Sequence, residues 1–205
     1  MAPQIQVTGI VLAGGMSRRL GRNKALEPVG GQLLIDRVTG QLSQIAQQTV
    51  VVVNDAQRES ELNLPDTCKV VIDAYQGKGS LGGIFTGLSA SDGEWGIVVA
   101  CDMPFLNIRL FNHMLSQTQG CDAVVPVLDG RPEPIHAIYS KKCLPFIKSK
   151  INNNDLKISR FFDEIDVKFI PEENIISLDP GLLSFFNVNT QEDLDRATAL
   201  AMEGR

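Results

Sequence analysis

The chain has 205 residues, of which 43% are hydrophobic and 21% are charged, a composition typical of globular proteins. Its formal net charge of −5 does not favour binding to nucleic acid or to an anionic membrane surface. No apolar run has the length of a membrane span, and residues 1–4 lack the features of a secretion signal, so we expect a cytoplasmic protein with no nucleic-acid and no membrane partner.

Short apolar runs alternate with amphipathic helical patterns along the chain. This βαβ rhythm is typical of an α/β protein whose parallel sheet is covered by helices on both faces. In chain order, the patterns predict a strand at 5–12, a helix at 33–45, strands at 49–53 and 69–72, a helix at 81–90, a strand at 96–101, a helix at 105–115, strands at 123–127 and 135–139, helices at 141–150 and 156–162, a strand at 166–170 and a helix at 191–202. No repeat or linker interrupts them, so residues 1–205 are expected to form one domain.

Two local signals refine this plan. The turn at 129–132 separates two strand-like runs and predicts a hairpin-like insertion, which would make the sheet mixed. Thr190 directly precedes the last helical pattern and is expected to be its N-cap.

The first predicted strand ends in a loop that is rich in glycine and in cations. Leu12 and Ala13 lead into Gly14, Gly15 and Gly21, and the cations that follow are Arg18, Arg19, Arg22 and Lys24. Glycines let a backbone approach a ligand, and cations neutralise phosphate charge. The spacing fits neither a Walker A loop nor the G-x-G-x-x-G dinucleotide motif. We therefore predict a nucleoside triphosphate site, in which Lys24 contacts the β- and γ-phosphates and Arg18 or Arg19 adds a guanidinium.

Polar residues recur where predicted strands end, at Gly14 and Gly15, Asn54, Asp73 and Asp102. In an open parallel sheet this edge is where ligands bind. Asp102 ends a buried run, and Mg²⁺ is usually held by one or two carboxylates together with phosphates and water. Asp102 is therefore a candidate metal ligand, with an N-cap or Asx turn before the next helix as the alternative.

The four cysteines do not predict a zinc or redox site, because no two of them have C-x-x-C spacing and only two histidines could assist. Cys101 and Cys121 lie in or beside apolar runs, where cysteine usually acts as a small core residue. We expect structural thiols.

Motif blocks along essentially the whole chain resemble those of the nucleotidyltransferases, and most closely those of the molybdenum cofactor guanylyltransferases. The matching blocks are residues 12–24 (L-A-G-G-x-S-x-R-x-G-x-x-K), residues 73–88 (D-x-x-x-x-x-G-P-L-x-G-I-x-x-G-L), the metal-binding strand end at 98–106, residues 130–139 (G-R-x-E-P-L-H-A-x-Y) and residues 186–190 (the last five positions of F-x-N-V-N-T). Ser80 departs from the second motif, which has proline there and a stiffer loop. The resemblance implies a Rossmann-like three-layer nucleotidyltransferase fold with a mostly parallel central sheet.

The resemblance also implies roles for individual residues. Those expected to bind the nucleotide are Leu12, Ala13, Gly14, Gly15, Lys24, Asn54, Asp73, Gly79, Gly82 and Asp102. Asp102 would hold Mg²⁺, while Lys24 and Arg18 would act on the phosphates, with Arg19 as a solvated neighbour. For Asp73, a solvated position in a turn before the helix is the alternative.

Four residues are candidates for contact with the second substrate: Arg131, His136, Asn187 and Asn189. His136 could equally be a structural histidine. Asn187 and Asn189 alternate with Val188, so both amides are expected on one side of an extended segment. There they would bind a pterin or a phosphate, or fix the entry to the last helix.

The implied activity is transfer of GMP from GTP to molybdopterin or its molybdenum form, with Mg²⁺ as cofactor and pyrophosphate as the second product. Further implied partners are other proteins of molybdenum cofactor biosynthesis and acceptor molybdoenzymes. One alternative is a nucleotidyltransferase that uses CTP or a sugar phosphate. Such enzymes often read L-A-A-G in this loop, and Gly14 favours the guanylyl branch because a missing Cβ leaves room for a purine. The other alternative is a GTP-sensing or chaperone-like module without turnover, against which Lys24 and Asp102 argue.

Overall fold

The computed structural model describes residues 6–15 and 23–204 of the chain. Within them the expected α/β architecture is confirmed, because eight strands form one sheet in the order β10-β7-β9-β6-β1-β4-β5, with β8 paired to β7. The strands are β1 (Val7–Leu12), β4 (Gln48–Val53), β5 (Cys68–Ile72), β6 (Trp95–Ala100), β7 (Ala123–Leu128), β8 (Arg131–Pro132), β9 (His136–Ser140) and β10 (Val167–Ile170). A small antiparallel hairpin of β2 (Pro28–Val29) and β3 (Gln32–Leu33) lies outside this sheet.

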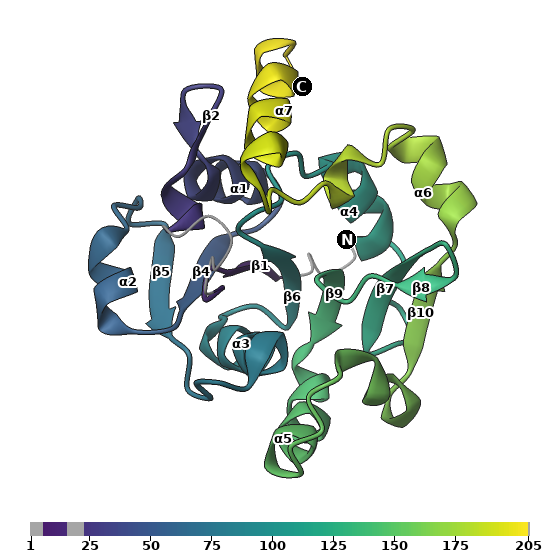
Figure 1. Ribbon diagram of the computed structural model, residues 1–205. Helices are drawn as coiled ribbons and strands as arrows, with labels where there is room; N and C mark the ends of the chain where they lie inside the picture. Colours follow the sequence, from purple (N-terminus) through teal and green to yellow (C-terminus); the bar gives the residue numbers. More distant parts are fainter. Residues whose placement is uncertain (1–5, 16–22, 205) are drawn as a thin grey trace.

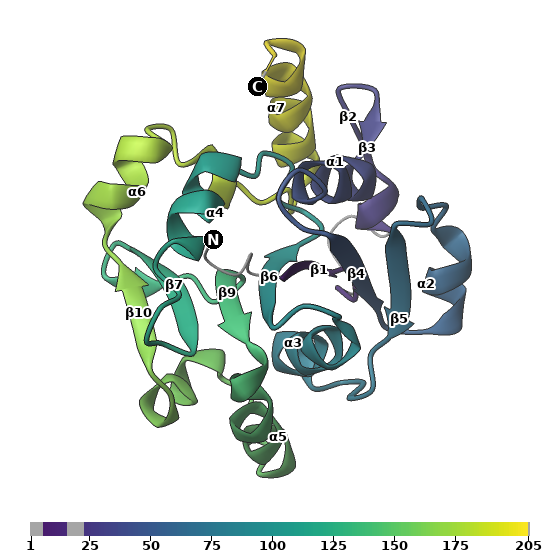
Figure 2. The ribbon, with the colours of Figure 1, turned by 180° about the vertical axis from the view of Figure 1, so that it is seen from behind.

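Helices cover both faces of the sheet, which gives the three layers predicted from the sequence. The helices are α1 (Leu34–Leu42), α2 (Ala56–Glu61), α3 (Gly79–Ala90), α4 (Ile108–Leu115), α5 (Leu144–Asn152), α6 (Glu172–Leu178) and α7 (Gln191–Met202). In Figure 1 and Figure 2, α1 and α4 lie on one face of the sheet, and α3 and α5 lie on the other.

The central strands are apolar on both faces, so the sheet separates two apolar cores. Val11 and Val51 pack in the core with α1 and α4, whereas their neighbours Ile10 and Val50 pack in the core with α3 and α5. Each fully buried aliphatic side chain of this kind contributes about 1.5–3 kcal/mol. This packing holds the strand ends in fixed places, as a site at their edge requires.

The carboxyl ends of β6, β1, β4 and β5 meet at one edge, because these strands are parallel neighbours. Leu12, the last residue of β1, is paired with Val52 in β4 and with Ala100 in β6. The segments that leave these strands therefore start side by side, and they carry the glycine loop, Asn54 and Asp102.

β9 runs antiparallel to both β6 and β7, which confirms the mixed sheet expected from the turn at 129–132. His136, at the start of β9, is paired with Val99 near the end of β6. The loop that enters β9, residues 133–135, therefore lies at the same edge as the carboxyl ends of β6 and β1.

Two of the predicted helices have a different form or a different start in the structure. The pattern at 156–162 forms two 3₁₀ turns, η3 (Ile158–Arg160) and η4 (Phe162–Glu164), in place of a helix. Ile158 and Phe161 are both buried, and a three-residue turn brings positions i and i+3 to the same side. The helix expected from residue 105 begins three residues later in α4, because Asn107 caps it and accepts a hydrogen bond from the Leu110 N–H.

Other elements are not predicted from the sequence. α2 contains no buried residue, so no apolar stripe marks it, and α6 and the β2–β3 hairpin are short. The last helix is confirmed: α7 spans Gln191–Met202, and Thr190 forms a capping box with Asp193. Within residues 6–15 and 23–204, no helix combines the length and the apolar character needed to cross a membrane.

Candidate active site

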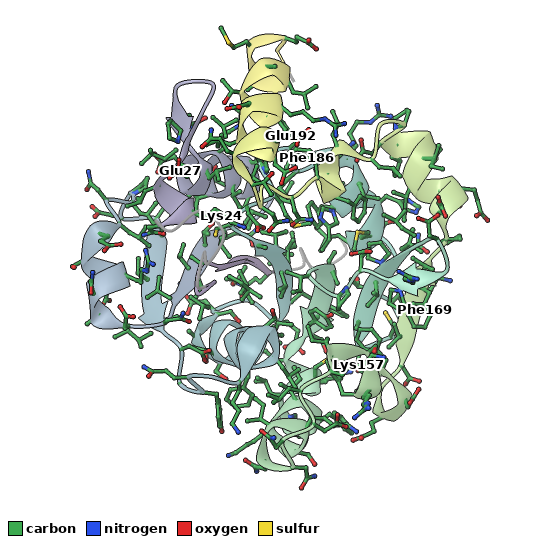
Figure 3. The ribbon with its side chains drawn as sticks, in the orientation of Figure 1. Lys24, Glu27, Lys157, Phe169, Phe186 and Glu192 are labelled. Carbon is green, nitrogen blue, oxygen red and sulfur yellow. The ribbon has the colours of Figure 1, made fainter. Side chains whose placement is uncertain are left out.

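A pocket of about 830 Å³ opens at the carboxyl ends of β6, β1, β4 and β5. The predicted nucleotide-binding residues that line it are Leu12, Ala13, Gly14, Gly15, Lys24, Asn54, Asp73, Gly79 and Asp102. In Figure 3, Lys24 lies beside the sheet, close to the end of α7 that is nearer the sheet. The fold thus brings together residues from the whole first half of the chain, as expected for the open edge of a parallel sheet.

The glycine loop is attached to its neighbour strand by two hydrogen bonds. The Ala13 N–H donates to the Val52 carbonyl at 2.8 Å, and the Asn54 amide donates to the Gly14 carbonyl. A Cβ atom at Gly14 would overlap the Asn54 amide oxygen. The space beside Gly14 is therefore filled by Asn54, which corrects the expectation that it is left for a purine. In the structure, the missing Cβ of Gly14 leaves room for the Asn54 side chain in the pocket wall.

Lys24 and Asp102 form an ion pair in the pocket wall. Lys24 Nζ lies 2.8 Å from Asp102 Oδ2 and 2.9 Å from Asn189 Oδ1. The two charged side chains are only 14% and 16% exposed. Asp102 Oδ1 is also buried, and no hydrogen bond reaches it from the described part of the chain. A buried carboxylate oxygen without a donor is costly, so this atom is a place for a ligand's cation or donor.

Asp102 does not cap the helix that follows it. The N-cap of α4 is Asn107, and the backbone N–H of Met103 donates to the Ala100 carbonyl. The alternative role of Asp102 as an N-cap is therefore wrong, and its carboxylate faces the pocket.

The segment before α7 closes one side of the site. The Val188 N–H donates to the Asp102 carbonyl at 2.9 Å, and Val188 itself is fully buried. The Asn189 N–H donates to Asp193 Oδ2 at 2.9 Å, and this bond holds the pKa of Asp193 below its usual range. Asn189 is thus fixed between the start of α7 and the ammonium of Lys24. Asn187 lines the pocket, while its amide donates to the Phe185 carbonyl.

Asp73 takes part in a turn and also lines the pocket. Its Oδ1 accepts hydrogen bonds from the Tyr75 N–H at 3.0 Å and from the Thr86 hydroxyl at 2.7 Å. It is buried, which differs from the solvated turn residue of the alternative interpretation. Gly82 does not line this pocket: a Cβ there would lie 2.9 Å from the Tyr75 carbonyl oxygen, so Gly82 allows the loop to pack on α3.

Arg131 does not line the main pocket. It is exposed and lies in a second cavity of about 520 Å³ together with Lys157. Ser80 and Pro134 line both cavities, so the two adjoin. Arg131 therefore stays a candidate only for a ligand that extends beyond the main pocket.

His136 is a core residue, which corrects its expected contact with the second substrate. Its side chain is fully buried, with Nε2 at 3.0 Å from the Ser184 hydroxyl. The ring lies between Phe111 and Phe185, with centroid distances of 4.5 and 4.3 Å. Burial lowers the pKa of His136 to about 3. The histidine is therefore neutral at physiological pH and out of reach of the pocket.

This burial predicts a pH dependence of stability. In the unfolded chain the histidine has an ordinary pKa of about 6.5. Below that pH the unfolded chain therefore binds a proton that the folded chain does not bind. The contribution of neutral His136 is fully present above pH 6.5 and is lost as the pH falls towards 3, by at most about 1.4 kcal/mol per pH unit. Urea unfolding of the wild type and of His136→Leu at several pH values measures the effect. As the pH falls below 6.5, the unfolding free energy of the wild type should decrease relative to that of His136→Leu. Parallel curves would show that His136 titrates normally.

Arg18 lies within residues 16–22, outside the described residues. Counted along the motif, the arginine of L-A-G-G-x-S-x-R falls on Arg19, which corrects the preference for Arg18 and leaves both as candidates.

The sequence does not single out Glu133, although it lines the pocket beside Pro134. The signal that could have found it is the fixed glutamate of the motif G-R-x-E-P-L-H-A-x-Y, which falls on Glu133. The cysteines supply no further reactive group here: burial raises the pKa of the Cys101 and Cys143 thiols to about 12, so both are protonated at neutral pH.

Comparison with known proteins places this site in a family. The MobA-like NTP transferase domain matches residues 9–167. A "Probable molybdenum cofactor guanylyltransferase" from Pelotomaculum thermopropionicum is 37% identical over 98% of this chain and 96% of its own length. A "Molybdenum cofactor guanylyltransferase" from Desulfosudis oleivorans is 34% identical over 97% of this chain and 98% of its own length. The crystal structure of molybdopterin-guanine dinucleotide biosynthesis protein A from Archaeoglobus fulgidus is similar with a TM-score of 0.83 and 31% identity, covering 96% of this chain and 99% of that one. The chain therefore belongs to the MobA-like NTP transferase family and, within it, to the molybdenum cofactor guanylyltransferases.

Proposed function

We propose that this chain transfers GMP from GTP to molybdenum-bound molybdopterin, giving the guanine dinucleotide cofactor and pyrophosphate. The observation that carries the proposal is the ion pair of Lys24 and Asp102 in the wall of a pocket at the carboxyl edge of the sheet. The names of the relatives add the choice of GTP and of the molybdenum cofactor.

The proposal takes residues 1–205 as one nucleotidyltransferase domain, since strands from both halves of the chain pair in one sheet. It keeps the cytoplasmic location expected from the sequence. Other proteins of molybdenum cofactor biosynthesis and the acceptor molybdoenzymes are its expected further partners.

The reaction needs no nucleophile from the protein. The terminal phosphate of the acceptor attacks the α-phosphorus of GTP in line, one P–O bond forms, and the bond to pyrophosphate breaks. The protein contributes by positioning the reactants and by stabilising charge. The backbone of residues 12–15 borders the phosphates, and the Lys24 ammonium offsets the charge that grows on pyrophosphate. Asn54 and Asp73 border the nucleoside.

The residues at the site fit a divalent cation, and we propose Mg²⁺. Asp102 Oδ1 is a buried carboxylate oxygen without a donor from the described residues, and oxygen is the ligand that Mg²⁺ prefers. The described residues contain no group of three acidic, histidine or cysteine side chains that could hold a metal by themselves. Asp102 would therefore share the ion with the phosphates and water. When bound, Mg²⁺ supplies positive charge that neutralises the triphosphate.

The direct test is incubation of the protein with GTP, Mg²⁺ and molybdenum-bound molybdopterin, followed by detection of the dinucleotide by mass and of pyrophosphate by assay. We expect both products with GTP and far less with CTP. Formation of the cytosine dinucleotide at equal rate would favour the CTP alternative. Binding of GTP and acceptor without either product would favour the module without turnover.

Gly14→Ala is expected to lower kcat/KM for GTP, and for CTP if it is used, because the substitution displaces Asn54. The new methyl group would overlap the Asn54 amide and move it from the nucleoside half of the pocket. The expected effect is roughly 1–3 kcal/mol, as for one methylene in a fitted pocket. Gly40→Ala is the matched control, because a Cβ at Gly40 meets no atom within 4 Å. If kcat/KM for GTP does not fall in Gly14→Ala, the placement of Asn54 by Gly14 does not matter for the nucleotide.

A further inference from the structure

Part of the pocket wall lies outside the nucleotide-binding residues expected from the sequence. Glu133 and Pro134, in the loop that enters β9, line the pocket together with Asn187. β9 pairs with β6, whereas Asn54 and Asp73 follow β4 and β5 on the other side of β1. The pocket therefore has a nucleoside half beside β4 and β5 and a second half beside β9. Asp102, which follows β6 and is paired with Lys24, lies between these two halves.

The loop of the second half is held in place by its own hydrogen bonds. The Glu133 N–H donates to the Pro126 carbonyl at 2.8 Å, and the Glu133 carbonyl accepts from the His136 N–H at 3.3 Å. The hydroxyl of Tyr139, a fully buried residue, donates to the Pro134 carbonyl at 2.8 Å. Prolines on both sides of Glu133 further restrict the backbone. The glutamate is therefore presented to the pocket from a rigid support.

The carboxylate of Glu133 has no partner of its own in this support. Within residues 6–15 and 23–204, no side chain or backbone N–H donates a hydrogen bond to it and no cation pairs with it, and burial is the only influence on its pKa. It is half-buried, and burial raises its pKa. A carboxylate withdrawn from water in this way gains most from a ligand that brings its own donors.

The chemistry of such a ligand is restricted. A carboxylate repels phosphate and attracts N–H or O–H donors, so Glu133 is suited to the donor-bearing part of a ligand. The edge of a 2-amino-4-oxopyrimidine ring fits well, because its ring N–H and its amino group can donate in parallel to the two carboxylate oxygens. Guanine and pterin both have this edge. Under the proposed function the guanine occupies the nucleoside half, and the pterin is left for the half that contains Glu133.

We propose, on the basis of that function, that Glu133 binds the 2-amino-4-oxopyrimidine edge of the pterin acceptor and thereby selects it. Glu133→Gln removes the charge and replaces one acceptor with a donor, and Glu133→Ala removes the group. Both variants should raise KM for the acceptor about 10- to 100-fold, as for loss of hydrogen bonds to a charged group, with a smaller effect on kcat. GTP affinity should stay within about twofold. Glu94→Gln is the control, an exposed glutamate at the opposite edge of the sheet.

Inosine triphosphate (ITP) tells whether Glu133 binds the guanine or the pterin, because the hypoxanthine base of ITP lacks the 2-amino group. The preference for GTP over ITP should be unchanged in the Glu133 variants. An unchanged acceptor KM in both variants would overturn the proposal. Loss of GTP affinity together with loss of the preference over ITP would also overturn it, by assigning Glu133 to guanine.

A binding measurement separates this proposal from the proposed function. 6-Methylpterin and 6-methyllumazine differ at position 2, where lumazine has an oxo group in place of the amino group. Without any turnover, the wild type should bind the pterin more tightly than the lumazine, and Glu133→Gln should lose this preference. If the wild type forms no dinucleotide, the proposed function fails, while the pterin preference still decides the role of Glu133. Equal binding of both compounds to the wild type would refute that role.

Discussion

Replacing Asp102 with asparagine is expected to lower kcat for GMP transfer by about 10²–10³ while the protein stays folded. Asparagine keeps the shape of the side chain and can still accept the hydrogen bond that Lys24 now gives to Asp102 Oδ2. It removes the negative charge from a site that is only 16% exposed and whose second oxygen is buried without a donor from the described residues. Loss of one such electrostatic group typically costs this much in rate. Initial rates over a series of Mg²⁺ concentrations measure the effect.

The matched control for Asp102→Asn is Asp92→Asn. Asp92 is an exposed aspartate in the turn before β6, at the edge of the sheet opposite the site. Its carboxylate accepts a hydrogen bond from Gln48 that an asparagine can also accept. Circular dichroism and thermal unfolding of both variants check the fold. Near wild-type rates for Asp102→Asn at limiting Mg²⁺ would contradict a role for this carboxylate in holding the metal.

The place of the site could be predicted from the sequence because of how the strands end. Each central strand is an apolar run that stops at glycine or at a polar residue, and parallel strands bring such ends to one edge. For this reason Gly14, Asn54, Asp73 and Asp102 line one pocket, although they are far apart in the chain. The antiparallel β9 could be predicted as well, since a short turn joins two strand-like runs.

The partners of individual side chains could not be predicted, because they depend on packing between distant segments. The motif around His136 reads the same whether the ring faces the pocket or the core. Its burial is decided by Phe111 and Phe185, which belong to other elements. The need for glycine at position 14 likewise could not be predicted from the glycine loop alone, because the atom that a Cβ would meet belongs to Asn54.

Replacing Lys24 with alanine is expected to lower kcat/KM for GTP roughly 10- to 100-fold, because hydrogen bonds to charged groups contribute about 1.5–3 kcal/mol. Lys24 is 14% exposed and lies where the glycine loop and Asp102 meet, so under the proposed function its ammonium contacts phosphate rather than base. GTP binding should therefore weaken far more than guanosine binding, which calorimetry with both ligands measures.

The substitution also leaves Asp102 without the cation that now lies 2.8 Å from it, so part of the loss could come from a displaced carboxylate. Guanosine distinguishes the two causes, because it carries no phosphate and reports only on the shape of the nucleoside half. Lys142→Ala is the control, since that lysine is 70% exposed and its nearest carboxylate oxygen lies 4.0 Å away. Equal losses for GTP and guanosine in Lys24→Ala would show that the lysine supports the pocket or contacts the base, and would refute its role on the phosphates.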